Sequence, residues 1–130
     1  MVLDTSAIVA TIVREPDAER YRNAMLAADA ITMSAVTALE SRIVLHARFG
    51  TKAVEAFEDM IEGARIEIVP FEARMADVAF DAFRRYGKGV GHPAQLNIVD
   101  CIAYALARVR AEPLLFKGND FGKTDVLRAI

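Results

Sequence analysis

The sequence predicts an α/β fold, in the form of a three-layer α/β/α sandwich with a small, mostly parallel central sheet. Short apolar segments alternate along the chain with longer segments in which apolar residues recur at helical spacing. No tight hairpin signal joins two of the short segments, so we expect right-handed crossovers and helices on both faces of the sheet. A chain of 130 residues, 54% of them hydrophobic, fits one domain over residues 1–130.

The chain before residue 70 predicts three strands and four helices. Pro16 suits the first turn of a helix, Ser34 suits an N-cap, and Gly50 suits a helix end. The strands are short runs rich in β-branched residues. In chain order, we expect a strand at 2–3, a helix that reaches 12, a helix at 16–28, a strand at 31–33, a helix at 34–49, a helix at 52–62 and a strand at 66–69.

The chain after residue 70 predicts two helices and one strand. The segment 87–95 holds three glycines and a proline, which is typical of a surface loop. Pro113 separates the last helix from the last strand. In chain order, we expect a helix at 72–86, the loop, a helix at 97–110, a strand at 114–116 and a turn at 117–120.

Composition indicates the compartment. The single cysteine, Cys101, cannot form an internal disulfide, which favours a reducing environment. No stretch of about 18 residues lacks a charge, so we expect no transmembrane helix. The first residues do not resemble a secretory signal. We therefore expect a cytoplasmic protein.

Charge is distributed unevenly along the chain. The formal net charge is −2, which taken alone argues against a protein that binds a polyanion. Residues 54–81 carry eight acidic and two basic side chains, whereas residues 82–130 carry four acidic and eight basic ones. The acidity is therefore local, and the C-terminal part of the chain is basic.

A carboxylate interrupts an apolar stripe in the helix expected at 34–49. Glu40 lies one turn from both Val36 and Val44. A buried carboxylate needs a cation or a hydrogen-bond donor, and both an ion pair with an arginine and a functional role satisfy this need. The stripe that we expect to face the core comprises Val36, Leu39, Glu40, Ile43, Val44 and Ala47.

Asp100 interrupts the apolar stripe of the helix expected at 97–110. It falls between Val99 and Ala103. If Asn97 is the N-cap, Asp100 is the third helical residue of a capping box, which is a structural role. The pattern leaves both a structural and a functional role open.

Two further aspartates follow apolar strands. Asp4 comes directly after Val2 and Leu3, and Asp120 comes four residues after Phe116. Both are expected at the carboxyl edge of the sheet, where ligands bind in open α/β sheets. Capping of the first helix is the alternative role for Asp4, and turn formation is the alternative role for Asp120.

Asp4, Glu40, Asp100 and Asp120 together predict a metal site. Helices that begin at the carboxyl edge present their first turns there, so all four carboxylates are expected in one pocket. They cannot all ionise without compensating charge, and oxygen ligands suit Mg²⁺ or Mn²⁺. A thiol or imidazole site is not expected, because the chain has one cysteine and two histidines without ligand spacing.

These residues resemble those of a known family. The N-terminal Asp4-Thr5-Ser6-Ala7, the two helical acids and the closing segment 114–121 look like the PIN-domain ribonucleases, specifically the VapC toxins of prokaryotic toxin–antitoxin pairs. The resemblance covers the whole chain. It implies a PIN-like fold and a Mg²⁺- or Mn²⁺-dependent endoribonuclease that cuts structured RNA, often tRNA or rRNA, and stops translation.

The resemblance also assigns site residues. Asp120 is chosen as the fourth acid, with Asn119 and Asp125 as the alternatives. The catalytic and metal-binding residues implied are Asp4, Glu40, Asp100 and Asp120, with Ser6 as a supporting hydroxyl residue. Candidates for phosphate contacts to RNA are Arg14, Arg84, Arg85, Lys88 and Lys117.

The family implies two protein partners. We expect a homodimer, with the helices at 34–49 and 52–62 as contacts. We also expect a small DNA-binding antitoxin of the VapB type whose tail crosses the active-site groove.

Two other functions fit parts of the sequence. A phosphatase of the haloacid dehalogenase type also uses an aspartate at a strand end, but it has a second aspartate two residues later, where this chain has Ser6. A catalytically silent PIN-like module that binds RNA or protein has no need of Glu40 on an apolar stripe.

Overall fold

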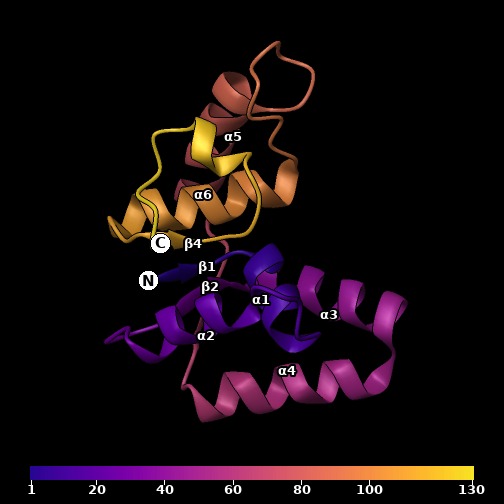
Figure 1. The fold of residues 1–130 in the computed structure, drawn as a ribbon. Coiled ribbons are helices and arrows are strands. Elements are labelled where there is room, and N and C mark those ends of the chain that lie inside the picture. Colours follow the sequence, from indigo (N-terminus) through magenta and orange to yellow (C-terminus); the bar gives the residue numbers. More distant parts are fainter.

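A four-stranded parallel sheet lies between two layers of helices in the computed structural model, which describes residues 1–130 (Figure 1). The strand order is β3-β2-β1-β4, which confirms the predicted α/β/α sandwich, and all strand pairs are parallel. The strands are β1 (Val2–Leu3), β2 (Thr32–Ser34), β3 (Glu67–Val69) and β4 (Leu114–Leu115). The helices are α1 (Thr5–Ile12), α2 (Ala18–Leu26), α3 (Ala35–Phe49), α4 (Thr51–Gly63), α5 (Ala73–Tyr86) and α6 (Ile98–Arg110), and a 3₁₀ turn spans Phe121–Lys123.

The element order agrees with the sequence prediction, and only boundaries differ. β2 begins at Thr32, because the Thr32 amide is the first to pair, with the Met1 carbonyl at 2.9 Å. α2 begins two residues after Pro16, because the Ala18 amide donates to the Glu15 carbonyl at 2.9 Å and closes a turn there. No helix combines the length and the apolar character that spanning a membrane requires.

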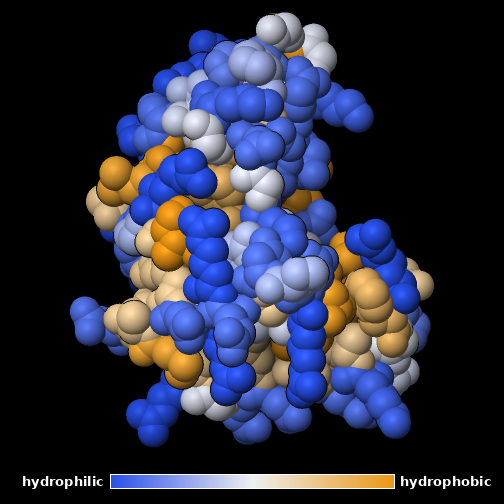
Figure 2. Space-filling view, viewed as in Figure 1, coloured by the Kyte–Doolittle hydropathy of each residue, from blue (hydrophilic) through white to orange (hydrophobic).

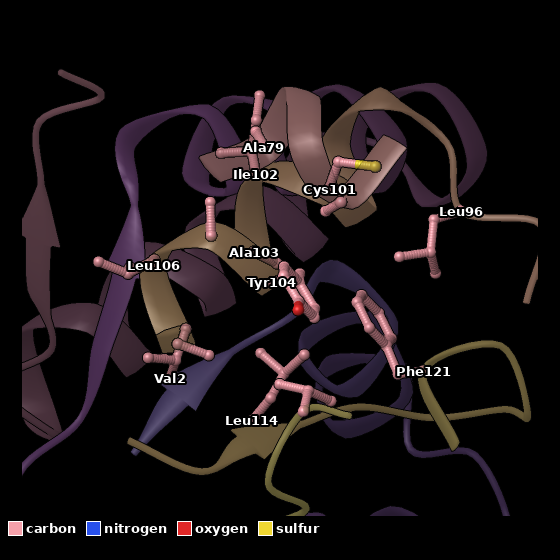
Figure 3. Close-up of a cluster of buried hydrophobic side chains, with 14 of the residues drawn as sticks. Val2, Ala79, Leu96, Cys101, Ile102, Ala103, Tyr104, Leu106, Leu114 and Phe121 are labelled. Carbon is pink, nitrogen blue, oxygen red and sulfur yellow. The ribbon is translucent and has the colours of Figure 1, made fainter. Parts of the chain in front are cut away.

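Alternate residues of the adjacent strands β1 and β4 divide the core into two halves. Val2 and Leu114 are fully buried on the side of α5 and α6, and Tyr104 lies in the same cluster (Figure 3). Leu3 and Leu115 are fully buried on the side of α1 to α4. Because successive side chains of a strand point to opposite faces, two residues per strand suffice to anchor both helical layers.

The predicted core-facing stripe of α3 is correct only in part, since Val36 and Val44 are half-buried against the core while its other apolar members are exposed. Leu39 and Ile43 are 56% and 58% exposed, and Ala47 is exposed as well. The hydroxyl of Ser41 is buried instead and donates to the Thr5 hydroxyl at 3.5 Å, so a polar residue is accommodated inside. The outward face of this helix therefore carries two large apolar residues. The buried residues of α3 are Thr37, Ala38, Ser41 and Leu45.

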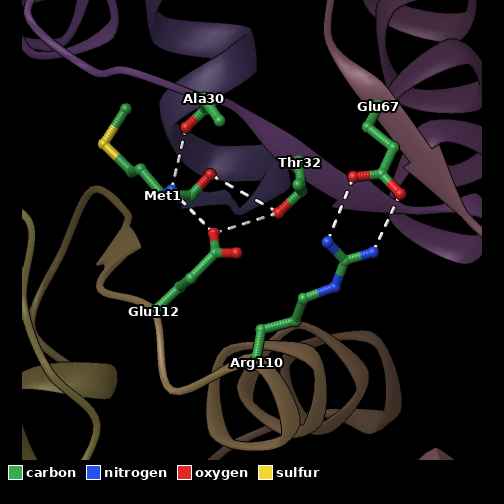
Figure 4. A network of polar contacts seen from close by, with 6 residues as sticks. All are labelled: Met1, Ala30, Thr32, Glu67, Arg110 and Glu112. Carbon is green, nitrogen blue, oxygen red and sulfur yellow. Dashed lines mark hydrogen bonds and ion pairs between the residues drawn. The ribbon is translucent and has the colours of Figure 1, made fainter.

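Two ion pairs lie at the amino edge of the sheet (Figure 4). The amino group of Met1 donates to Glu112 Oε2 at 2.7 Å and to the Ala30 carbonyl at 2.9 Å. Arg110 donates two hydrogen bonds to the Glu67 carboxylate, at 2.8 and 3.1 Å. The charged groups at this edge are thus matched with partners.

We expect Leu115→Ala to lower the free energy of unfolding by about 3 kcal/mol, because truncation of a fully buried leucine leaves a cavity. Leu26→Ala is the control: Leu26 is 75% exposed, so we expect a change within about 0.5 kcal/mol. Urea unfolding followed by circular dichroism measures both. Equal losses in the two variants would contradict the division of the core described above.

Candidate active site

Asp4 lies at the junction of β1 and α1. It is the N-cap of α1, as the sequence allowed, and its carboxylate accepts hydrogen bonds from the Ser6 amide at 2.9 Å and the Ser6 hydroxyl at 2.5 Å. Asp4 is 3% exposed. Burial raises the pKa of its carboxyl, the bonds from Ser6 oppose this rise, and the charge of Glu40 adds to it. Asp4 is therefore a buried acid with another acid nearby.

Ser6 connects Asp4 to the neighbouring strand. Its hydroxyl donates to Asp4 and accepts from the amide of Lys117, just after β4, at 2.9 Å. β1 and β4 are adjacent in the sheet, so this bond joins the strand that ends in Asp4 to the segment that leads to Asp120. The contact fits the supporting role expected for Ser6.

Glu40 lies in the second turn of α3 and is half-buried. Its carboxylate accepts a hydrogen bond from the Thr5 hydroxyl at 2.5 Å. No basic side chain lies within ion-pair distance, so the ion-pair alternative for Glu40 is wrong. The bond from Thr5 was not predicted from the sequence, although the position of Thr5 directly after Asp4 was a signal that it lies near the site.

Asp100 is the third helical residue of a capping box, which is the structural role that the sequence left open. The Asp100 amide donates to Asn97 Oδ1 at 2.9 Å, and the Asn97 amide donates to Asp100 Oδ2 at 2.8 Å. Burial raises the pKa of Asp100 to about 7; the bond from Asn97 opposes the rise, and the charges of Asp4, Glu40 and Asp120 increase it. The capping bond uses only Oδ2 of Asp100, so the structural role and a functional role of this carboxylate are compatible.

Asp120 is presented by the turn after β4. Gly118 in this turn has a φ of +100°, a conformation that favours glycine, and the 3₁₀ turn begins directly after Asp120. Asp120 is exposed and lies 3.8 Å from the Lys123 ammonium. Its charge is one of those that raise the pKa of Asp100, so it lies near the other acids.

The two alternatives for the fourth acid lie in different surroundings. Asn119 is exposed in the turn. Asp125 accepts hydrogen bonds from the Tyr104 hydroxyl at 2.6 Å and from Arg85 at 3.1 Å. This network was not predicted from the sequence, where Asp125 was only a possible ligand. Both oxygens of Asp125 thus have partners, whereas the charge of Asp120 acts on Asp100.

The carboxyl edge of the sheet contrasts with the paired amino edge in Figure 4. Asp4, Glu40 and Asp100 influence one another electrostatically, and none of them is paired with a basic side chain. No three Asp, Glu, His or Cys side chains are arranged to hold a metal ion as they stand. Mg²⁺ nevertheless suits this donor set, because it binds through one or two carboxylates and keeps several waters.

Three of the five basic residues considered for RNA contacts are already paired. Lys117 forms ion pairs with Glu15 and with Asp17, the latter at 2.6 Å. Arg85 is bound to Asp125, and Arg84 lies 3.7 Å from an aspartate on the same helix. The two without an ion pair, both exposed, are Arg14 and Lys88.

Comparison with known proteins identifies the family. A family model described as PIN domain matches residues 1–127. Ribonuclease VapC28 of Mycobacterium tuberculosis is 45% identical over 130 residues, which are 100% of this chain and 98% of the relative. Ribonuclease VapC of Mycolicibacterium smegmatis is 46% identical over 126 residues, 97% of each chain. The chain belongs to the VapC ribonucleases of the PIN-domain family.

Solved structures share the VapC fold of this chain. VapC20 of Mycobacterium tuberculosis, described as a sarcin-ricin loop cleaving toxin, has a TM-score of 0.78 at 15% identity and covers 97% of this chain and 95% of its own. A toxin–antitoxin complex from Klebsiella pneumoniae has a TM-score of 0.71 at 15% identity, with 99% and 97% covered. At these identities the likeness shows the fold alone.

Without metal, we expect Asp100→Asn to raise the melting temperature, and the gain to grow as the pH rises from about 4 to 7. The pKa of Asp100 is about 7 in the folded protein against an ordinary value of 3.8, so ionisation destabilises the folded state over this range. Asparagine cannot ionise and keeps an acceptor for the Asn97 amide. We expect a gain of roughly 5 °C at about pH 8.

Scanning calorimetry in the presence of EDTA measures this difference across the pH range. A gain that is the same at about pH 4 and pH 8 would show that Asp100 does not carry the raised pKa.

Proposed function

We propose that the chain is the toxin of a VapBC-type toxin–antitoxin pair, an endoribonuclease that hydrolyses RNA phosphodiesters with Mg²⁺ or Mn²⁺. The observation that carries this proposal is the meeting of Asp4, Glu40 and Asp100 at one sheet edge without a paired basic side chain. Such acids require compensating positive charge, and a divalent cation supplies it. The proposed substrate is a tRNA or rRNA, whose cleavage in the cytoplasm inhibits translation.

The proposed ligands of the metal are Asp4, Glu40, Asp100 and Asp120. These carboxylates would hold a divalent cation, which would supply activation of a water near neutral pH and stabilisation of the leaving oxygen. Ser6 orients Asp4 through its amide and hydroxyl, and Thr5 orients Glu40 through its hydroxyl. The amide of Asn97 fixes one oxygen of Asp100 and leaves the other oxygen for the site.

For the RNA backbone, we propose contacts from Arg14 and Lys88. Both are exposed and have no ion pair within the chain, so their charges are available to phosphates. Lys117 and Arg85 are held by carboxylates and are assigned to structure instead. Phosphate contacts position the RNA and leave sequence selection to other groups.

We also propose a VapB-type antitoxin and a homodimer as the protein assemblies of this chain. The fold is shared with a chain of a toxin–antitoxin complex, which supports the first. Figure 2 shows apolar surface over α3, where Leu39 and Ile43 are exposed, and this supports α3 as a dimer contact. α4 offers less, because its large aromatic residue, Phe57, is fully buried.

The other two functions have less support. In a phosphatase of the haloacid dehalogenase type, position 6 would carry a second acid, whereas Ser6 donates to Asp4. A silent binding module gains nothing from unpaired acids that raise the pKa of Asp100. Failure of the parent protein to cut RNA at millimolar Mn²⁺ while it still binds RNA would favour the module.

We expect Asp4→Asn and Asp100→Asn to lower the rate of RNA cleavage by more than about 100-fold, because even groups that only orient metal ligands change activity by 10- to 100-fold. Growth arrest on induced expression should be lost together with cleavage. Asp77→Asn is the control, since Asp77 is exposed on α5 and has no ion pair. Cleavage by the Asp4→Asn protein at the parent's rate in Mg²⁺ would refute the carboxylate site.

For the homodimer, we expect light scattering at micromolar concentration to give twice the mass of one chain. Ile43→Asp should give the mass of one chain, because it places a charge on the apolar face of α3. Leu127→Asp should remain dimeric, since Leu127 is exposed to a similar degree, 61% against 58%, but lies outside α3. A monomeric parent protein would exclude the proposed dimer.

A further inference from the structure

One carboxylate outside the proposed metal site ties the segment after β4 to two helices. Asp125 Oδ1 accepts a hydrogen bond from the Tyr104 hydroxyl of α6 at 2.6 Å, and Asp125 Oδ2 accepts one from Arg85 of α5 at 3.1 Å. Arg85 also lies over the ring of Tyr86, with 4.6 Å between the guanidinium carbon and the ring centroid. Asp125 is thus the polar anchor of this segment.

The chain between Asp120 and Asp125 is a short, closed turn. Phe121 is buried, with its ring 5.1 Å from that of Phe116, and the Thr124 hydroxyl donates to the Phe121 carbonyl at 2.8 Å. The Asp120 side chain is exposed, and its one ion-pair contact is with Lys123 at 3.8 Å. Its position therefore depends on the anchors that follow it in the chain.

Tyr104, which donates to Asp125, and the ligand candidate Asp100 belong to the same helix. Tyr104 follows Asp100 by one turn of α6, on the same side of the helix. Figure 3 shows Tyr104 and Phe121 beside one another between α6 and β4. The Tyr104–Asp125 bond consequently connects the segment that carries Asp120 to the helix that carries Asp100.

We propose that Asp125 is a positioning residue: held by Tyr104 and Arg85, it fixes Asp120 relative to Asp100 and so increases the affinity of the site for a divalent metal. This inference rests on the proposed function of the four acids. Groups that orient metal ligands typically change metal affinity by 10- to 100-fold. Asp125 acts in this view without touching the metal or the RNA.

Calorimetric titration of the full chain with Mn²⁺ tests the proposal. We expect Tyr104→Phe and Asp125→Ala to weaken Mn²⁺ binding by about tenfold, and Asp125→Asn, which keeps an acceptor for the Tyr104 hydroxyl, to retain most of the affinity. Asp81→Asn is the matched control and should bind as the parent does. Asp81 also faces Arg85, at 3.9 Å, but lies on α5 outside the turn.

The same titration in an Asp120→Asn background separates positioning from a general structural role. If Asp125 acts through Asp120, adding Tyr104→Phe there should change Mn²⁺ affinity by less than about twofold. An equal loss in both backgrounds, or parent-like binding by Tyr104→Phe and Asp125→Ala, would overturn the inference. Absence of Mn²⁺ binding to the parent would instead overturn the proposed function. Tyr104→Phe removes only one hydroxyl, so it keeps the test decisive if Asp125→Ala does not fold.

Discussion

Repulsion among carboxylates at the carboxyl edge of the sheet is the constraint on which the site depends. Asp4 is almost fully buried, and Asp100 has a pKa of about 7, because burial and neighbouring acids both disfavour the ionised forms. The amino edge has no such strain, since Glu67 and Glu112 have cationic partners there. The protein thus leaves one group of charges uncompensated at the position where parallel α/β sheets bind ligands.

The fold produces this arrangement with ordinary helix signals. Asp4 caps α1 and Asp100 completes the capping box of α6, so two of the acids are fixed by the backbone amides that begin each helix. α1 starts at this edge because it follows β1 directly, and α6 starts there because it leads the chain back to the amino end of the parallel strand β4. The capping and functional interpretations of these residues are therefore compatible, because each cap uses only one of the two carboxylate oxygens.

The order of the elements and the location of the acids could be predicted from the sequence, because strand ends and helix caps are local patterns. The face of α3 could not be predicted, because Leu39 and Ile43 are exposed while Ser41 is buried on the hydroxyl of Thr5. Apolar patterning does not distinguish a core from a surface that another molecule covers. The contacts of Asp125 could not be predicted from the sequence either, because its bond to Tyr104 joins positions 21 residues apart.

The central claim is that the unpaired acids hold a divalent metal, and a crystal structure of the parent protein grown with Mn²⁺ tests it most directly. Anomalous scattering locates Mn²⁺ without any assumption about its ligands. We predict a peak in contact with the carboxylates of Asp4 and Asp100, at the carboxyl edge of β1 and the start of α6. A peak only elsewhere, or none at millimolar Mn²⁺, would contradict it.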